Sequence, residues 1–424
     1  MYKAIVTTIK TRPHPNADRI QLGIACGYQV IIGLEVKNGN LGVYFPCDGQ
    51  LSHEMCMKNS LYNKNPETGE SMGGYFDKNR RVRAQIFRGE KSEGFWIPVS
   101  FFEWTGVTLK EGMEFDSLNG INICNKYFPP ATQNAVANAN SKIKKTKSVR
   151  YSTNMFYQHF DTAQLRFNLN LIPKGALIIL SEKLHGTSGR TGYVLTEKNI
   201  KPWQYKINKL FRKYIFKPKP IWMKLTGSRR VTFFPDQSKD FYYKTNFRET
   251  ISNDLSLRKG ETLYYEIVGF TDSGSSIMET HTVHDKNLIK RYGKDMTYSY
   301  GVPLGAVKPW RIFVYRITQT NEEGHSVDLS HSQMLSRVKE LGLESVPVLD
   351  TFIHDGNPEN LLEQVKKYAD GPSTLDQSHI REGVAIRVEH ENMHKIFKYK
   401  GFHFCELEGI RKNDDTYVDL EDIS

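Results

Sequence analysis

The sequence has 424 residues, 39% hydrophobic and 12% aromatic, which suits two or three globular domains and excludes a disordered chain. No apolar run approaches the roughly 20 residues that cross a bilayer, and the first residues lack the features of a signal peptide. We therefore expect a cytoplasmic or nuclear protein. The five cysteines form no CxxC pair, which indicates reduced thiols and no zinc site.

The net charge of +11 favours a polyanionic partner. The surplus lies in one stretch, because residues 198–230 contain eleven lysines and arginines and no acidic residue. The rest of the chain is therefore close to neutral.

The first 120 or so residues predict short strands at 28–33, 41–46, 81–87 and 94–99, separated by turn signals. We interpret residues 1–125 as a small β-barrel, in which Arg81, Arg83 and Arg88 line a basic, RNA-binding face. A solvated strand face is the alternative for these arginines. The stretch HPNADRI at 14–20 resembles a loop of tRNA-binding OB-fold modules.

Residues 126–155 contain Pro129-Pro130, an Ala/Asn-rich run and the basic KIKKTK, typical of a flexible basic linker. The remaining residues, 156–424, alternate strands at 176–180, 262–270 and 311–317 with helices. One helix is predicted at 331–342, and another begins after Asn357 with Pro358 in its first turn. The pattern predicts an α+β domain with mostly antiparallel sheets.

A candidate nucleophile, Lys183, occurs in Ser-Glu-Lys-Leu-His-Gly-Thr. This motif alone is weak, but four further elements follow in order: YYEIVG, the aromatic strand RIFVYRI, EGVAIR and a KxK strand. Their key residues are Glu266, Phe313, Tyr315, Glu382, Lys398 and Lys400. The order and spacing over residues 180–400 resemble the signature of the covalent nucleotidyltransferase superfamily of DNA ligases, RNA ligases and mRNA capping enzymes. The resemblance implies an ATP-grasp-like ligase adenylation domain.

The chemistry of that superfamily explains these residue types. A lysine attacks the α-phosphorus of ATP only as the neutral amine, so its pKa must fall from about 10.4. Lys398, Lys400 and a divalent metal supply positive charge for this and for the α-phosphate. Glu266 and Glu382 are oxygen donors suited to Mg²⁺ or Mn²⁺, directly or through water, or one of them holds the ribose hydroxyls.

Other nucleotide-binding candidates surround this set. Phe313 is expected to stack on adenine, with Tyr315 as the alternative, since both point to one side of a strand. The neighbours of Lys183 complete the set: Glu182, His185, Gly186 and Arg190. Arg190, Arg229 and Arg230 are candidates for phosphate or RNA contacts, and surface salt bridges are their alternative role.

The domain order points to one branch of the superfamily. DNA ligases and capping enzymes carry an OB domain after the KxK strand, whereas only 24 residues follow Lys400 and the predicted OB domain comes first. This order resembles the Naegleria-type RNA ligases, the fifth class of ATP-dependent RNA ligases. The resemblance implies an enzyme that uses ATP, forms lysyl-AMP and RNA-adenylate, and seals 3′-OH and 5′-PO₄ ends at nicks in duplex RNA. We expect a monomer.

One residue departs from the superfamily pattern KxDG, because His185 replaces the aspartate. The imidazole would have to accept the hydrogen bond that the aspartate carboxylate otherwise accepts. Activity would then be sensitive to pH near the usual histidine pKa of about 6.5. Two alternatives stay open: a non-catalytic RNA-binding homologue, and a nucleotidyltransferase of the DNA-ligase or capping type.

The basic stretch 198–230 also holds six aromatic residues: Trp203, Tyr205, Phe211, Tyr214, Phe216 and Trp222. This mixture predicts a nucleic-acid-binding insertion that contacts phosphates and stacks on bases or sugars. A membrane-surface helix has the same composition. We favour RNA and expect no membrane partner, because the neighbouring chemistry already requires a polyanion.

Overall fold

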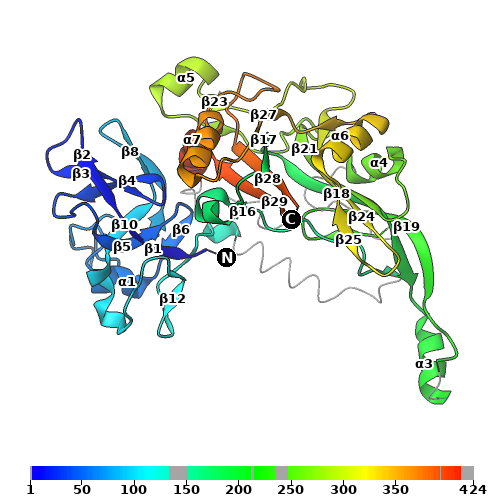
Figure 1. The fold of residues 1–424 in the computed structure, drawn as a ribbon. Helices are drawn as coiled ribbons and strands as arrows, with labels where there is room; N and C mark the ends of the chain where they lie inside the picture. Colours follow the sequence, from blue (N-terminus) through cyan, green and yellow to red (C-terminus); the bar gives the residue numbers. More distant parts are fainter. Residues whose placement is uncertain (1, 133–150, 212–213, 235–246, 392, 412–424) are drawn as a thin grey trace. The chain divides into compact units, whose positions relative to one another are not determined.

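The computed structural model describes residues 2–132, 151–211, 214–234, 247–391 and 393–411 (Figure 1). The chain forms two compact units. The first contains residues 1–131 and the segment that begins at Lys400, and the second contains residues 132–399.

The first unit is built from small antiparallel sheets around one apolar core. A four-stranded sheet has the order β10 (Phe95–Pro98), β5 (Leu41–Phe45), β1 (Ala4–Thr8), β11 (Glu114–Phe115). Two three-stranded sheets contain β2 (Lys10–Pro13), β3 (Ile20–Ala25) and β4 (Tyr28–Gly33), and β14 (Cys124–Lys126), β6 (Gly49–Leu51) and β7 (Arg81–Val82). Two hairpins are β8 (Ala84–Phe87) with β9 (Glu90–Glu93) and β12 (Ser117–Leu118) with β13 (Ile121–Asn122). Helices of the described residues in this unit include α1 (His53–Lys58), η1 (Val99–Thr105) and α8 (Phe402–Arg411).

The predicted strands occur in this unit. Residues 28–33 form β4, residues 41–46 contain β5, residues 94–99 contain β10, and residues 81–87 form β7 and β8 with a break at Arg83. The antiparallel α+β character is confirmed. The pairings within residues 2–126 form separate sheets rather than one closed barrel, so the OB-fold barrel stays a prediction.

The turn of the β8–β9 hairpin holds the segment HPNADRI in place. Arg88 and Gly89 form this turn with φ of 47° and 89°, and positive φ at both positions gives the twist that a two-residue hairpin requires. The Asn16 side-chain amide donates to the Arg88 carbonyl at 2.9 Å. A ring nitrogen of His14 lies 3.2 Å from the Phe87 carbonyl oxygen.

The second unit contains two larger sheets. The five-stranded sheet has the order β16 (Ala163–Gln164), β29 (Met393–Lys400), β28 (Gly383–His390), β17 (Leu177–Lys183), β27 (Val348–Ile353). Apolar side chains of α7 (Pro358–Ala369), among them Leu361 and Val365, pack with Ile178, Leu180 and Ile386 in its core. The short helices η2 (Leu165–Phe167) and η3 (Leu169–Leu171) precede β17.

The eight-stranded sheet has the order β20 (Thr232–Phe233), β19 (Lys219–Gly227), β18 (Thr187–Lys198), β21 (Glu261–Gly269), β24 (Trp310–Thr320), β25 (Ser326–Asp328). The strand β15 (Tyr151–Ser152) adds to β18, and β26 (Glu344–Ser345) adds to β24. One face packs against α4 (Phe247–Asp254) and α6 (His331–Glu340) through residues such as Tyr265, Ile267, Ile251 and Met334. The connections contain α3 (Pro202–Phe211), α5 (Lys286–Tyr292), β22 (His281–Thr282) and β23 (Asp295–Met296).

The two sheets of this unit are joined directly. Strand β17 of the five-stranded sheet ends at Lys183, and β18 of the eight-stranded sheet begins at Thr187. The three residues between them, Leu184 to Gly186, therefore carry the chain from one sheet to the other.

Two predicted boundaries are only partly covered. Most of the predicted linker 126–155 lies outside the described residues; its ends form part of β14 and of β15. The predicted second domain ran to residue 424, whereas α8 belongs to the first unit. Burial of Phe402, Phe404 and Leu407 there provides the physical reason. No helix in the described part of the chain is long and apolar enough to cross a membrane.

Candidate active site

Lys183 and Glu382 form an ion pair at the ends of two neighbouring strands. Lys183 ends β17 and lies opposite Gly383 of β28, so Glu382, the residue before Gly383, is brought beside it. The Lys183 Nζ lies 2.6 Å from Glu382 Oε2, and the two side chains are 24% and 1% exposed. A buried carboxylate next to an ammonium stabilises the charged form of both groups. The structure thus brings together two of the predicted site residues, 199 positions apart in the sequence.

His185 lies near the same oxygen of this carboxylate. Its Nδ1 is 3.7 Å from Glu382 Oε2. Its backbone N–H donates to the Tyr300 hydroxyl at 2.6 Å, and its ring packs against the rings of Tyr298 and His281. These three partners belong to the connection between β21 and β24, and no motif in the sequence pointed to them.

Gly186 explains why the motif requires a glycine. A Cβ at this position would lie 2.5 Å from the Ile267 carbonyl oxygen and 2.9 Å from Glu266 Cγ, which is closer than van der Waals contact permits. The absence of a side chain therefore lets the motif approach β21 at Glu266. Ser188, two residues further on, donates to Glu266 Oε2 at 3.4 Å.

Glu182 has a different environment from Lys183. Its carboxylate is 1% exposed and accepts hydrogen bonds from the Thr374 backbone N–H at 2.8 Å and hydroxyl at 2.6 Å. In this state its side chain fixes the segment before β28. Its predicted contact with a nucleotide stays a prediction.

The aromatic strand β24 lies beside Glu266. Phe313 is directly opposite Glu266 in the strand register, but its ring is 1% exposed, so stacking on adenine would require a neighbour to move. Tyr315 follows on the same strand, and the pKa of its phenol is raised by burial and by the nearby Glu266 carboxylate. Both aromatic candidates thus belong to the strand beside Glu266, and the choice between them stays open.

A segment that the sequence analysis did not select covers part of this sheet. The His159 ring lies 5.1 Å from Tyr315 and 5.8 Å from Tyr264, between ring centroids, and the Tyr264 hydroxyl donates to the Tyr157 carbonyl at 2.9 Å. The pKa of His159 is lowered to about 3, first by burial and then by the positive charge of Arg316. The available signal was the aromatic run FYQHF at 156–160.

The predicted phosphate-binding arginines have protein partners in this state. The buried Arg190 donates to the Thr232 hydroxyl at 3.0 Å and lies over the Phe156 ring. Arg229 forms an ion pair of 2.5 Å with Asp161. The backbone carbonyl of Arg230 accepts from the Gln158 side chain at 2.8 Å.

The two lysines of the KxK strand lie on β29. Lys398 contributes positive charge near Asp161, whose pKa is lowered mainly by its hydrogen bond from Arg229 and further by Arg230 and Lys398. Lys400 is the last residue of β29 and forms an ion pair of 2.8 Å with Glu408 of α8. Its ammonium also lies 5.1 Å from the centre of the Phe404 ring.

The structure corrects one of the predicted RNA-binding arginines. Arg81 is 4% exposed, donates to the Gly409 carbonyl at 2.6 Å and pairs with Asp48 at 3.3 Å. It therefore connects α8 to the sheets of the first unit instead of lining an exposed face. Arg83 is half-buried and Arg88 is exposed, so these two remain candidates.

The described residues contain no group of three or more His, Cys, Asp or Glu side chains that would enclose a metal ion. Glu266 and Glu382 nevertheless fit a magnesium-type site, since Mg²⁺ is commonly held by one or two carboxylates, with waters and substrate phosphates as the other ligands. Glu266 lies in β21 of the eight-stranded sheet, and Glu382 directly precedes β28 of the five-stranded sheet. This donor set suits a metal that arrives with a nucleotide.

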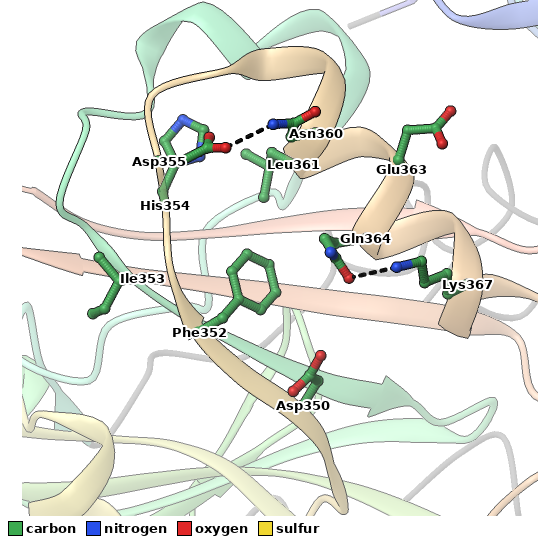
Figure 2. A pocket seen from close by; sticks show the side chains of 10 residues that line it. All are labelled: Asp350, Phe352, Ile353, His354, Asp355, Asn360, Leu361, Glu363, Gln364 and Lys367. Atoms are coloured by element: carbon green, nitrogen blue, oxygen red, sulfur yellow. Dashed lines mark hydrogen bonds and ion pairs between the residues drawn. The ribbon is translucent and has the colours of Figure 1, made fainter.

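A separate cavity of about 520 Å³ lies between β27 and α7. Figure 2 shows Asp350 and Phe352 on the strand side and Gln364 and Lys367 on the helix. Ile353 of its lining is paired with Leu177, at the opposite end of β17 from Lys183. The cavity is therefore distinct from the ion pair at Lys183.

The family model described as RNA ligase matches residues 176–400. This range includes Lys183, Glu266 and Glu382. The chain belongs to the RNA ligase family and is an ATP-dependent ligase. No curated protein matches the sequence.

Solved structures of Naegleria gruberi RNA ligase are similar over most of both chains. A mutant with ATP and Mn matches with a TM-score of 0.55 and 17% identity, covering 95% of this chain and 98% of that one. A mutant with AMP and Mn gives 0.57 and 18% with the same coverage. A structure with PPi gives 0.56 and 17%, covering 95% and 97%. At this identity the likeness concerns the fold.

Proposed function

We propose that this protein seals 3′-OH and 5′-PO₄ ends of RNA, at nicks in a duplex, through a covalent lysyl-AMP on Lys183 and an RNA-adenylate. The observation that carries the proposal is the ion pair of Lys183 with the buried Glu382. It is joined by the packing of Gly186 against Glu266. A single short motif thus connects a nucleophile to two carboxylates from different sheets.

Three displacements at phosphorus make up the proposed reaction. Lys183 Nζ forms a bond to the α-phosphorus of ATP as the bond to pyrophosphate breaks, and Nζ must lose a proton to become nucleophilic. A 5′-phosphate oxygen of RNA then attacks the same phosphorus and displaces the lysine. Finally the 3′-hydroxyl attacks the 5′-phosphorus and AMP leaves. The net result is one phosphodiester bond, with ATP converted to AMP and pyrophosphate.

The ion pair has a direct consequence for the first step. While Glu382 contacts Lys183 at 2.6 Å, the charged ammonium is favoured, so this contact must open before attack. Glu266 and Glu382 would hold Mg²⁺ or Mn²⁺, whose charge stabilises the α-phosphate during transfer. Structures of Naegleria gruberi RNA ligase with ATP and Mn or with AMP and Mn support the choice of ATP and such a metal. Lys398 and Lys400 are the proposed protein cations for the same phosphates.

RNA contacts are proposed in two regions, described separately. In the first unit, taken as the OB-fold domain over residues 1–125, Arg88 is exposed and Arg83 half-exposed. In the second, α3 and the residues after it expose large side chains between lysines: Trp203 is 52% exposed, Leu210 77% and Tyr214 85%. With no acidic residue between 198 and 230, this insertion is suited to a polyanion.

Labelling with ATP carrying ³²P at the α-position tests the proposed chemistry. Wild-type protein is expected to form an acid-stable labelled adduct with ATP and not with GTP, and Lys183→Ala none. The adduct should disappear when duplex RNA with a 3′-OH/5′-PO₄ nick is added, as sealed product appears. Absence of an adduct with either nucleotide would support a non-catalytic RNA-binding homologue. A GTP adduct, or sealing of nicked DNA in preference to RNA, would support a capping-type or DNA-ligase function.

Charge reversal tests the proposed role of α3. The double variant Lys206→Glu, Lys209→Glu should weaken binding of nicked duplex RNA. The slope of the logarithm of the binding constant against the logarithm of the salt concentration should become shallower by about 1–2, because binding releases fewer counterions for each phosphate contact that is lost. The matched control is Lys339→Glu with Lys367→Glu, exposed lysines on α6 and α7. Equal RNA binding by both variants would refute the proposal. Binding of wild type to anionic vesicles, lost in the α3 variant alone, would favour a membrane surface.

A further inference from the structure

We propose that Tyr298 and His281 are positioning residues that hold the His185 imidazole against Glu382. His185 then takes the place of the aspartate of the superfamily motif in a site whose other residues support the imidazole, and it is not a sign of lost activity. The inference rests on the proposed function of Lys183. It concerns residues that lie 98 and 115 positions beyond Lys183.

The His185 ring is held on two sides. Tyr298 meets it edge-to-face, with ring centroids 4.8 Å apart and an interplanar angle of 78°. His281 lies nearly parallel to it, at 5.9 Å and 21°. The His281 Nδ1 lies within hydrogen-bond distance, 2.9 Å, of the Tyr298 hydroxyl. All three side chains are buried, so each ring restricts the others.

One connection supplies both rings. His281 begins β22 and is paired with Met296 of β23, two residues before Tyr298. The same segment continues to Tyr300, whose hydroxyl accepts the backbone N–H of His185 at 2.6 Å. The connection between β21 and β24 therefore fixes both the main chain and the ring of His185.

The same tyrosines also contact the segment that carries Glu382. His379, three residues before Glu382, has its ring centroid 5.0 Å from Tyr298 and 4.5 Å from Tyr300. The Tyr300 N–H donates to His379 Nε2 at 3.4 Å, and the Asp376 carboxylate accepts from the Gly301 N–H at 3.0 Å. Tyr298 and Tyr300 thus contact both elements that meet at the Lys183–Glu382 ion pair.

This environment suits an imidazole and not a carboxylate. Aspartate at position 185 would lose the ring contacts with Tyr298 and His281, since its side chain is shorter and has no ring. It would also place a second negative charge near Glu382, whose Oε2 is 3.7 Å from the present Nδ1, in buried surroundings where like charges repel strongly. The residue that is usual in the superfamily is therefore expected to be harmful here.

The experiment measures single-turnover formation of lysyl-AMP in the full-length protein over a range of ATP concentrations. Tyr298→Ala should lower the maximal rate by about ten- to a hundredfold, as misplacement of a reacting group does, with little change in the half-saturating ATP concentration. Tyr298→Phe keeps the ring and should retain most of the rate. His281→Ala should lower the maximal rate, and His185→Asp should do so rather than restore it. Tyr292→Ala, in the same connection, is the control.

A double-mutant cycle separates positioning from general structural damage. If Tyr298 acts through His185, the Tyr298→Ala, His185→Ala double variant should be no slower than His185→Ala alone. The inference would be overturned if the rate losses of the two single variants multiply in the double variant, or if Tyr298→Ala labels at the wild-type rate. In either case, labelling of the wild-type protein would leave the proposed function intact. A wild-type rate in His185→Asp would also overturn it. Absence of labelling in wild type would overturn both. If Tyr298→Ala does not fold, the His281→Ala and His185→Asp rates decide.

Discussion

The ammonium of Lys183 lies 2.6 Å from the carboxylate of Glu382, which is 1% exposed. In this arrangement the ion pair favours the charged form of the proposed nucleophile, which cannot attack phosphorus. The same contact neutralises a buried carboxylate that would otherwise be costly. Glu382 is thus expected to have two roles, one in the resting protein and one when nucleotide and metal bind.

Glu382→Gln should remove both roles while preserving shape. We expect lysyl-AMP formation to fall by at least about a hundredfold, since the site loses a proposed ligand of the metal ion whose charge would stabilise the transferring phosphoryl group. The measurement is the single-turnover rate of labelling with ATP at several Mg²⁺ concentrations. Glu340→Gln, at a half-exposed surface ion pair with Arg258, is the control and should label normally. A wild-type rate in Glu382→Gln would contradict the proposed role.

Gly186→Ala tests the close approach of the motif to β21. The added Cβ would lie 2.5 Å from the Ile267 backbone oxygen, and this atom cannot move away as a flexible side chain could. We expect a loss of about 1–3 kcal/mol in the free energy of unfolding, measured by urea denaturation, and a severe loss of labelling. Gly409→Ala on α8, where the nearest atoms are 3.9 Å away, should keep full stability. Equal stability of the two variants would contradict this account.

Arg81 and Arg88 provide a contrast between a structural and an exposed arginine. Arg81→Ala removes the donor to Gly409 and the partner of Asp48, so we expect a loss of about 2–4 kcal/mol in the free energy of unfolding. Arg88→Ala should change stability by less than about 0.5 kcal/mol and weaken RNA binding. Urea denaturation and RNA titration of both variants check this. Normal stability of Arg81→Ala would restore it as a surface candidate.

The strands that carry the motifs could be predicted from the sequence, because each has a clear apolar pattern. Residues 262–270 and 311–317 were predicted as strands; β21 covers the first range up to residue 269, and β24 covers the second completely. Glu382 and Lys183 were predicted to share a site, and the register of β17 with β28 explains how they meet. Order along the chain was therefore enough to select the residues, although it gave no distances.

Contacts between distant segments could not be predicted. The partners of His185 lie in the connection between β21 and β24, where His281 and Tyr298 belong to no recognised motif. Helix α8 is stabilised by burial of Phe402 and Phe404, which is a tertiary effect. The burial of Arg81 follows from the same helix. Strand alternation indicates two faces but does not say which of them another segment covers.

His159 should make stability depend on pH. Its pKa is lowered to about 3 in the fold, by burial first and then by Arg316 and Arg229, whereas in an unfolded chain it is about 6.5. Below pH 6.5 the unfolded chain therefore binds a proton that the folded chain does not. Stability contributed by the neutral ring is complete above this pH and is lost as the pH falls toward 3.

Urea denaturation at pH 7 and pH 5 measures this effect. Because the ring is partly exposed, we expect His159 to account for at most about 1–2 kcal/mol of the stability lost between these two pH values. His159→Phe keeps an aromatic ring that cannot titrate, so its loss should be smaller by that amount. His379 and His331, whose pKa values are also lowered by burial, should keep the remaining loss above zero. The exposed His325 provides the control: His325→Gln should behave as wild type. An equal loss in wild type and His159→Phe would show that His159 becomes protonated in the fold without opposing it.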